Sequence, residues 1–232
     1  ATAYLSTTDT GLTISALATA VGLTADIVAI DGNFTNSGYV GADAIALVDI
    51  SIVADSTGGN ANAHLAATGT TLSITASATA TGLSASITTL SGDFANSGDI
   101  DVLASAAIII DVSANGGGDA TAFISGSEIS ITASASALGM FLTITDVGGS
   151  VTNSGDIVAT AAALVDLSVT ADGGENASAS INATSSSVSI LASLADSALD
   201  LVASLGIFFA VRWAAAPPDE DHRHGHGKGE AL

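Results

Sequence analysis

Oxygen-bearing side chains recur beside paired glycines at three places along the chain. The pairs are Gly58-Gly59, Gly117-Gly118 and Gly173-Gly174. Carboxylate and amide oxygens are the hard donors that Ca²⁺ prefers, so each turn is a candidate calcium site. Ordinary Asx turns, in which the side chain bonds nearby backbone, are the alternative. The candidate ligands are Asp55, Asn60, Asn115, Asp119, Asp172 and Glu175.

Three alternating histidines suggest a different metal. His222, His224 and His226 follow Pro217-Pro218 in an acidic stretch, and we expect residues 217–232 to form a flexible tail. Neutral imidazoles at this spacing suit Zn, Ni or Cu. Histidine-rich tails also bind such metals without any biological role, so a functional metal site is one of two hypotheses here.

Catalytic chemistry has few candidate residues. The chain has no cysteine, which excludes disulfides and cysteine nucleophiles, and His64 is the one histidine in residues 1–211. Asp99 and Asp101 stand two residues apart on an expected strand and could act as the carboxylate pair of a glycan hydrolase. A solvated acidic edge explains them more simply. We expect no enzymatic activity and no required cofactor, with Ca²⁺ as a candidate ligand.

Charge excludes one class of partner. The chain carries 23 acidic and three basic residues, a formal net charge of −20, and the cations Arg212, Arg223 and Lys228 all follow residue 211. Binding to nucleic acid requires cations that neutralise phosphates, so nucleic acid is not an expected partner. With 48% hydrophobic but only 4% aromatic residues, the chain should fold around aliphatic side chains.

The elements that position these residues repeat along the chain. Ala-Thr-Ala-Tyr-Leu at residues 1–5 has counterparts beginning at residues 61, 120 and 177, which gives periods of 60, 59 and 57. Such a period is typical of repeat architectures. We predict a repeat domain over residues 1–190, with units 1–60, 61–119, 120–176 and a partial unit 177–190.

Within a unit, apolar residues alternate with Ser and Thr, which predicts strands. Leu72, Ile74 and Ala76 fall on one face, and Ser73 and Thr75 on the other. Because each period divides into three stretches, we expect an all-β parallel β-solenoid with coils of about 20 residues, three to a repeat. An antiparallel β meander or sandwich is the alternative, since the glycines could also form hairpins.

The Asn-Ser-Gly turns add a family resemblance. Asn36-Ser-Gly, Asn96-Ser-Gly and Asn153-Ser-Gly each precede an Ala- and Val-rich strand. They resemble the turns of bacterial secreted β-helix repeat proteins, the surface adhesins of filamentous-haemagglutinin and autotransporter-passenger type. The resemblance implies a right-handed β-helix in a secreted or cell-surface protein, and a first residue other than Met fits a removed leader. Asn33, Asn176 and Asn182 begin sequons and are glycosylation candidates.

Residues 191–216 break the repeat. Their apolar residues recur at helical spacing, which predicts a cap on the repeat domain or a docking segment. A strand over residues 207–213 is the alternative, because Gly206 aligns with Gly148 in the repeat. Residues 198–216 approach bilayer-spanning length, but Asp200 and Arg212 within them favour a prediction of no membrane span.

These features together predict a non-enzymatic structural protein. We expect an exported β-solenoid that joins head to tail into an extracellular filament, or a surface adhesin, with copies of itself and host or matrix glycans as partners. Ice or polysaccharide binding through a Ser/Thr face is the alternative. The predicted assembly residues are Ala1, Ile207, Phe208, Phe209, Arg212 and Trp213.

Overall fold

A computed structural model describes residues 1–7, 11–183 and 188–193. The chain divides into two units, Ala1–Leu194 and Ala195–Leu232, and the second lies outside the described residues. The description below therefore concerns the first unit. The predicted His-rich tail, the docking segment beyond Ser193 and Arg212 also lie outside it.

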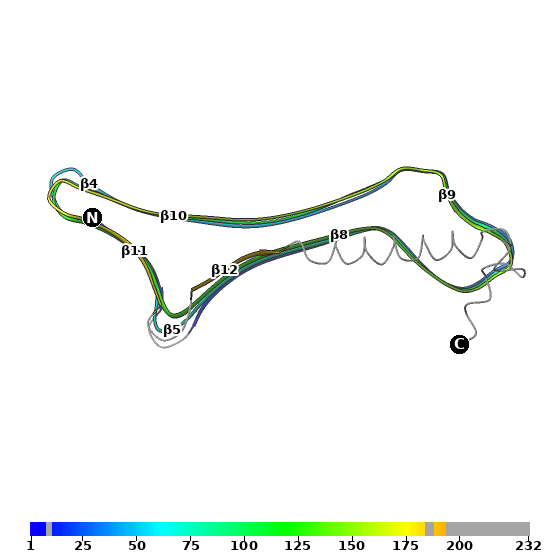
Figure 1. The fold of residues 1–232 in the computed structure, drawn as a ribbon, viewed down its shortest axis with the longest axis horizontal. Helices are drawn as coiled ribbons and strands as arrows, with labels where there is room; N and C mark the ends of the chain where they lie inside the picture. The colour runs from blue at the N-terminus through cyan, green and yellow to red at the C-terminus, as the bar shows by residue number, and fades with distance from the viewer. Residues whose placement is uncertain (8–10, 184–187, 194–232) are drawn as a thin grey trace, which may run out of the picture. The chain divides into compact units, whose positions relative to one another are not determined.

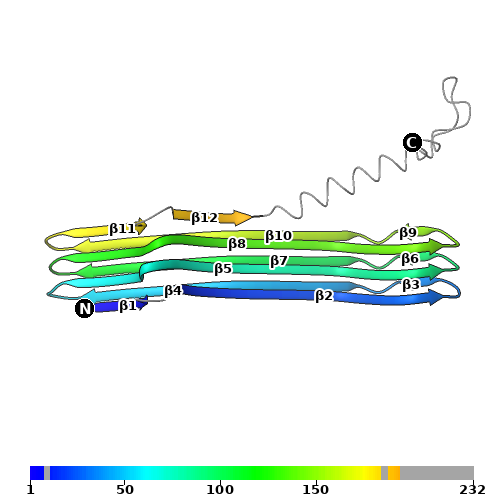
Figure 2. The same cartoon turned by 90° about the horizontal axis from the view of Figure 1, so that it is seen from below.

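The first unit consists of strands that recur in four layers, of which the last is partial (Figure 2). Layer 1 (residues 1–60) holds β1 to β4, layer 2 (61–119) β5 to β7, layer 3 (120–176) β8 to β10, and layer 4 begins at residue 177. The strands are β1 Thr2–Thr7, β2 Leu12–Ile30, β3 Phe34–Asn36, β4 Val40–Ser56, β5 Ala61–Leu90, β6 Phe94–Asn96, β7 Ile100–Gly116, β8 Ala120–Val147, β9 Val151–Asn153, β10 Ile157–Gly173, β11 Ala177–Ala183 and β12 Val188–Ser193.

Equivalent residues of successive layers pair directly and in parallel. Thr2 pairs with Asn62, Ala61 with Ala120, and Ala120 with Ala177. One layer therefore takes up a whole repeat, and the coil of about 20 residues is wrong. The antiparallel alternative is also wrong, because all strand pairs among the described residues are parallel. The coarser prediction, an all-β chain with parallel sheets, is confirmed. We call a set of equivalent residues in successive layers a rank.

Three sheets form the walls of the stack (Figure 1). One wall contains β4, β7 and β10, and the facing wall contains β2, β5, β8 and β12, with β1 and β11 continuing the same sheet. The short strands β3, β6 and β9 form the third sheet, at the corner between the walls.

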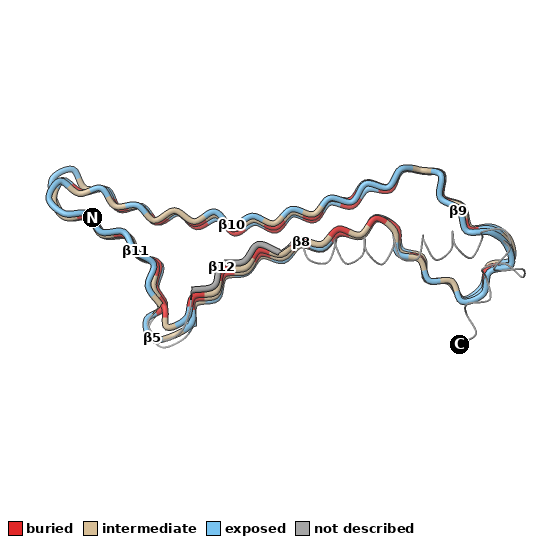
Figure 3. The backbone as a smooth tube through the Cα atoms, in the orientation of Figure 1, coloured by how far each residue is buried: buried red, intermediate tan, exposed pale blue. Residues whose placement is uncertain are grey.

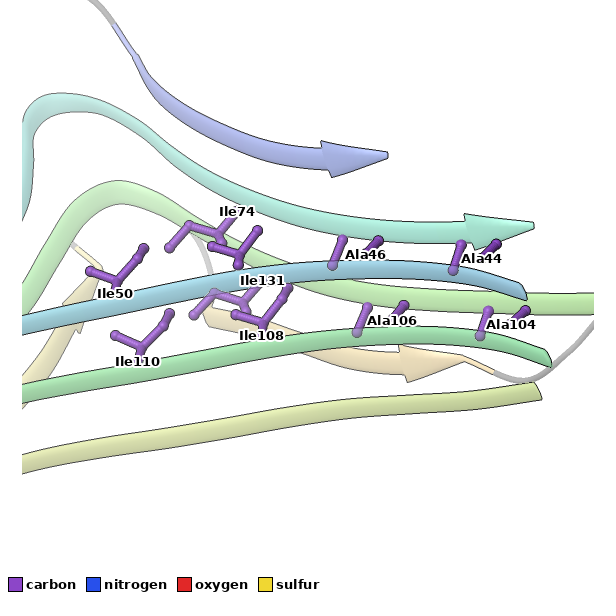
Figure 4. Close-up of a cluster of buried hydrophobic side chains, with 14 of the residues drawn as sticks. Ala44, Ala46, Ile50, Ile74, Ala104, Ala106, Ile108, Ile110 and Ile131 are labelled. Carbon is purple, nitrogen blue, oxygen red and sulfur yellow. The ribbon is translucent and has the colours of Figure 1, made fainter. Parts of the chain in front are cut away.

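The core lies between the two long walls, as the alternation of apolar residues predicted (Figure 3). Leu72, Ile74 and Ala76 on β5 are fully buried, while Ser73 and Thr75 on the same strand remain partly exposed. In Figure 4, Ile74 and Ile131 point from one wall toward Ile108 on the other. Alanines replace isoleucines in the first halves of β4 and β7, where small side chains let the walls approach.

A rank of glycines marks the closest approach of the walls. Gly22, Gly82 and Gly139 occupy equivalent positions on β2, β5 and β8. A Cβ atom added at Gly82 would clash with the Gly139 carbonyl oxygen and with the Ile100 side chain of the opposite wall. These positions therefore need glycine for space rather than for an unusual backbone angle.

Strand structure continues beyond the predicted end of the repeat. Residues Val188–Ser193 pair with Ile129–Ser134 of β8, so Leu191 is part of a strand and not of the predicted helical pattern. Among the residues that the structure describes, no helix has the length and apolar character needed to cross a bilayer.

Candidate functional site

A rank of asparagine side chains runs through the corner of the stack. The Asn36 Nδ2 atom donates to Asn96 Oδ1, and Asn96 Nδ2 donates to Asn153 Oδ1, both at 2.6 Å. Each amide also donates to the carbonyl oxygen two residues on, at Gly38, Gly98 and Gly155. Asn96 is the buried member, and all of its amide groups are used. The Asn-Ser-Gly motif therefore stabilises the corner rather than presenting groups to a ligand.

Aromatic side chains form ranks at two further places. The Phe34 and Phe94 rings stack with centroids 5.0 Å apart. The His64 ring lies between Tyr4 and Phe123, with centroid distances of 5.0 and 3.7 Å. His64 Nε2 is buried without a hydrogen-bond partner, and desolvation lowers the pKa of its imidazole. His64, packed between the Tyr4 and Phe123 rings, therefore has neither the substrate access of a catalytic base nor the neighbouring ligands of a metal site.

The turn that follows β2, β5 and β8 links layers through polar side chains. Asn33 Oδ1 accepts from the Asp93 backbone N–H, and Asp93 Oδ1 accepts from both the N–H and the hydroxyl of Ser150. The hydrogen bonds from Ser150 hold the pKa of Asp93 below its usual value, against a smaller opposing effect of desolvation. Asn33, a predicted glycosylation candidate, thus uses its side-chain oxygen within the stack.

Five of the six calcium candidates fall into two ranks, and Glu175 lies outside both. Asp55, Asn115 and Asp172 are directly paired on the outer surface of β4, β7 and β10. In the second rank, Asn60 Oδ1 accepts from the Asp119 N–H, and Asp119 Oδ1 accepts from Asn176 Nδ2. The Glu175 N–H bonds the Gly118 carbonyl. Of the glycosylation candidates, Asn176 is thereby engaged, and Asn182 pairs with Ser125 on β8.

No group of three or more His, Cys, Asp or Glu side chains that could hold a metal ion occurs in the described part of the chain. The predicted calcium residues therefore neighbour the equivalent residues of adjacent layers rather than gathering around one point. Calcium binding stays a prediction.

Asp99 and Asp101, the carboxylate pair considered for hydrolysis, form hydrogen bonds with different partners. Asp99 Oδ1 accepts from the Asp156 N–H of the next layer. Asp101 accepts a hydrogen bond from the Tyr39 hydroxyl, and desolvation, followed by the charges of Asp101 and Asp43, raises the pKa of that phenol. The two carboxylates therefore serve layer-to-layer and surface contacts.

A cavity of about 470 Å³ opens beside β1 and β4 in layer 1. Its lining comes from residues 3–5 and 49–53, which are mostly apolar. Ala1 lies close by, and its terminal amine donates to the Asn60 carbonyl oxygen at 2.7 Å. No set of convergent donors in this lining identifies a ligand.

Comparison with known proteins points to the other end of the chain. A family model described as the cation efflux transmembrane domain matches residues 179–232. The cation-efflux pump FieF of Shewanella oneidensis is 56% identical over 48 residues, which are 21% of this chain and 16% of that protein. The pumps of the same name from Yersinia enterocolitica and Yersinia pestis are 56% identical over 46 residues, 20% of this chain and 15% of each relative. No solved structure matches the chain.

The chain thus spans about a sixth of the length of the curated relatives that it matches, and the similarity begins within β11. This match corrects several predictions. The resemblance to secreted β-helix adhesins is wrong as a guide to family, because the matched family is one of cation efflux membrane domains.

The same finding contradicts the predicted functions and the setting in which they would occur. The match to a cation efflux domain contradicts the predicted filament or adhesin. It also contradicts the alternatives, which were ice binding, polysaccharide binding and glycan hydrolysis. The same match contradicts three further predictions. These are the partners (copies of the chain and glycans), the absence of a membrane span, and the extracellular location. The predictions had rested on the repeat, which lies almost wholly outside the matched residues.

Proposed function

We propose that residues 194–232, the part of the matched region that follows β12, contribute a membrane segment to the efflux of a divalent metal cation. The observation that carries this proposal is the match of residues 179–232 to the cation efflux transmembrane domain, with 56% identity to FieF pumps over 46 to 48 residues. The chain covers a small part of those pumps, so its share of the activity is that of one segment.

The charge pattern of this segment supports the proposal. Between residues 190 and 211 the only charged residues are Asp196 and Asp200, which are four apart. On a helix, this spacing places both on one face. Ionisable residues within a membrane segment face the protein interior or a water-filled path, where they mark ion routes. Asp200, which had favoured a prediction of no span, is on this proposal a cation-binding residue.

The downstream residues provide a second set of metal-binding groups. His222, His224 and His226 follow three consecutive acidic residues, Asp219, Glu220 and Asp221. Imidazole and carboxylate together suit divalent first-row transition metals. The proposal places these residues at the membrane surface, where they would bind cations that approach or leave the membrane segment. We expect no enzymatic activity from either set.

For residues 1–193 we propose a β-solenoid with one repeat of 57 to 60 residues in each coil. Support comes from the parallel pairing of equivalent residues across layers and from the Asn36–Asn96–Asn153 hydrogen bonds. On this proposal the solenoid is an appended domain that precedes the membrane segment.

Membrane insertion is the first test. The full chain, synthesised in the presence of liposomes, should remain with the lipid after alkaline extraction. Replacing Leu201 and Leu205 by Arg should release it, because each Arg costs about 2.5–3.5 kcal/mol at the centre of a membrane segment. Leu164→Arg in the stack is the matched control and should leave association unchanged. A chain that alkaline extraction removes without any substitution would contradict the proposal.

Cation binding is the second test. Isothermal titration of the liposome-bound chain with Zn²⁺ should give binding that Asp196→Asn with Asp200→Asn weakens at least about tenfold, a loss of about 1.4 kcal/mol. Asp43→Asn with Asp49→Asn is the control, since these two carboxylates stand six residues apart on β4 in the stack and are not among the candidate metal ligands. Equal binding by both double variants would argue against a cation site in the membrane segment.

A further inference from the structure

The outer face of the wall formed by β4, β7 and β10 differs from the rest of the stack. We define it as the acidic–apolar face. Its outward residues in layer 1 are Asp43, Ile45, Leu47, Asp49, Ser51, Val53 and Asp55; in layer 2 Leu103, Ser105, Ala107, Ile109, Asp111, Ser113 and Asn115; in layer 3 Thr160, Ala162, Leu164, Asp166, Ser168, Thr170 and Asp172.

Large apolar side chains stand open to solvent on this face. Ile45 is 65% exposed, Leu47 52% and Leu164 53%. Leu47, Ala107 and Leu164 form one rank, so the apolar strip crosses all three layers. Isolated exposed apolar residues are ordinary, but a strip bordered by charges is typical of a protein-binding surface.

The charges on the face are all negative. Asp43, Asp49 and Asp55 recur every six residues along β4, a spacing of about 20 Å at the rise of a strand. Asp166 and Asp172 continue the ranks of Asp49 and Asp55. Residues 1–211 contain no lysine or arginine, so no basic side chain of these two types in the stack neutralises these carboxylates.

The carboxylates are too dispersed to form a cation site among themselves. Within a rank an uncharged residue separates them: Ile109 lies between Asp49 and Asp166. Two layers correspond to about 9–10 Å of backbone separation. A single Ca²⁺ needs its oxygens within about 2.6 Å of the ion, so one ion does not bridge the rank.

We propose that the acidic–apolar face binds a basic polypeptide segment of a partner protein, one that carries Leu- or Ile-type side chains between its lysines or arginines. Charge complementarity selects this occupant. An uncharged apolar partner would desolvate the carboxylates without pairing them, and an anionic lipid surface would be repelled by them. The apolar strip supplies contact area, and the carboxylates supply the preference for basic partners.

The opposite wall provides a matched control. Leu17 on β2 is 78% exposed and lies in a rank with Ser77 and Ser134. Its surroundings on the outer surface are chiefly Ser and Thr, as in the rank of Ser15, Thr75 and Thr132. This surface therefore shares an exposed leucine with the acidic–apolar face but lacks its dense carboxylates.

The test uses the full chain and a labelled synthetic peptide as long as β4. Every second residue of the peptide is Leu or Lys, so that both types lie on one face of the extended chain, and the residues between them are Thr. Fluorescence anisotropy should show binding that weakens at least about tenfold between low and high ionic strength, as expected for exposed charges. Leu47→Ser with Leu164→Ser should weaken binding at least about fivefold, because the peptide would cover both leucine side chains on the face.

Three results would overturn the proposal. The first is equal loss in Leu17→Ser, which would mean that the peptide does not distinguish the walls. The second is no effect of the Leu47→Ser, Leu164→Ser pair, which would reduce binding to net charge. The third is displacement of the peptide by vesicles rich in phosphatidylserine but not by phosphatidylcholine vesicles, a comparison that the proposed membrane segment does not affect because it would associate with both. Circular dichroism of each variant verifies that the strands remain, and all three replacements are at exposed positions.

Discussion

Asn96 donates its side-chain amide to Asn153 across 57 residues of sequence while it accepts from Asn36 in the layer on its other side. The same amide group bonds the Gly98 carbonyl oxygen. A single buried side chain thus ties three layers together and closes its own turn. Such a hydrogen-bonded rank fixes the register, because a shift of one residue would leave buried amides without partners.

Removing the central asparagine should weaken the stack strongly. Asn96→Ala leaves the Asn36 amide and the Asn153 oxygen without their partner, and we expect a loss of about 3 kcal/mol in the free energy of unfolding. Urea unfolding followed by circular dichroism measures it. Asn36→Ala, at the end of the rank and more exposed, should cost less than half as much. Equal losses would show that the rank does not act through its buried member.

His64 should be a source of pH-dependent stability. Its folded-state pKa is lowered, so as pH falls below the ordinary value of about 6.5 the unfolded chain binds a proton that the folded chain resists. The stabilising contribution is complete above that value and is lost as pH falls toward the folded-state pKa. The urea midpoint should fall over this interval in the native sequence.

His64→Phe should remove this pH dependence. Phenylalanine continues the rank of Tyr4 and Phe123 and eliminates the unpaired Nε2, so stability should rise by about 1 kcal/mol at neutral pH. His64→Gln keeps a polar side chain without the titration, and serves as a control. A variant series with unchanged pH dependence would assign the effect to other groups.

The glycine rank predicts a sharp difference between two alanine substitutions. Gly82→Ala places a methyl group against the Gly139 carbonyl and the Ile100 side chain, so the walls must separate. We expect a loss of about 1–3 kcal/mol, the usual cost of overpacking. Gly58→Ala meets nothing within 4 Å and should be close to neutral. Differential scanning calorimetry of the two variants makes the comparison.

Engineered disulfides test the register directly, since the chain has no cysteine of its own. Ser77 and Ser134 are directly paired, so Ser77→Cys with Ser134→Cys should oxidise readily to a cross-linked chain. Ser77→Cys with Ser97→Cys represents the coil of about 20 residues and should remain reduced. Electrophoresis after protease digestion separates the outcomes, and cross-linking of the second pair would contradict the one-repeat layer.

The sequence predicted faces well and the length of the coil poorly. Alternation in Leu72, Ser73, Ile74 and Thr75 determines which side is buried, because the strand period of two is local. The coil length depends on which residues meet across the chain. A period near 60 accommodates either one long coil or three short ones, and alternation alone does not separate them.

The spacing of the corner asparagines in the sequence indicates the length of the coil. Asn36, Asn96 and Asn153 recur once per repeat, and an asparagine rank needs a partner in every adjacent layer. Coils of about 20 residues would have left each amide with non-asparagine neighbours. Once-per-repeat asparagines therefore favour one coil per repeat, a signal that was present in the sequence.

The functional prediction failed for a different reason. The repeat fills most of the chain and determines its average properties, whereas the similarity to known proteins lies in residues 179–232. The prediction of no membrane span uses the free-energy cost of placing the Asp200 carboxylate in a bilayer. The same cost is what makes an intramembrane carboxylate informative about ion transport, and composition does not distinguish these two interpretations.

The separation of carboxylates by uncharged residues within the β4–β7–β10 sheet restricts how the gene can change. No two carboxylates of that sheet occupy directly paired positions: Asp111 lies between Ser51 and Ser168, and Asn115 between Asp55 and Asp172. Tandem duplication of one repeat would stack Asp49 on a copy of itself, with like charges on adjacent strands. Unequal crossing-over between adjacent repeats would thus place like charges at directly paired positions, which destabilises the sheet. Divergence of neighbouring repeats is, in this sheet, an electrostatic condition for lengthening the array.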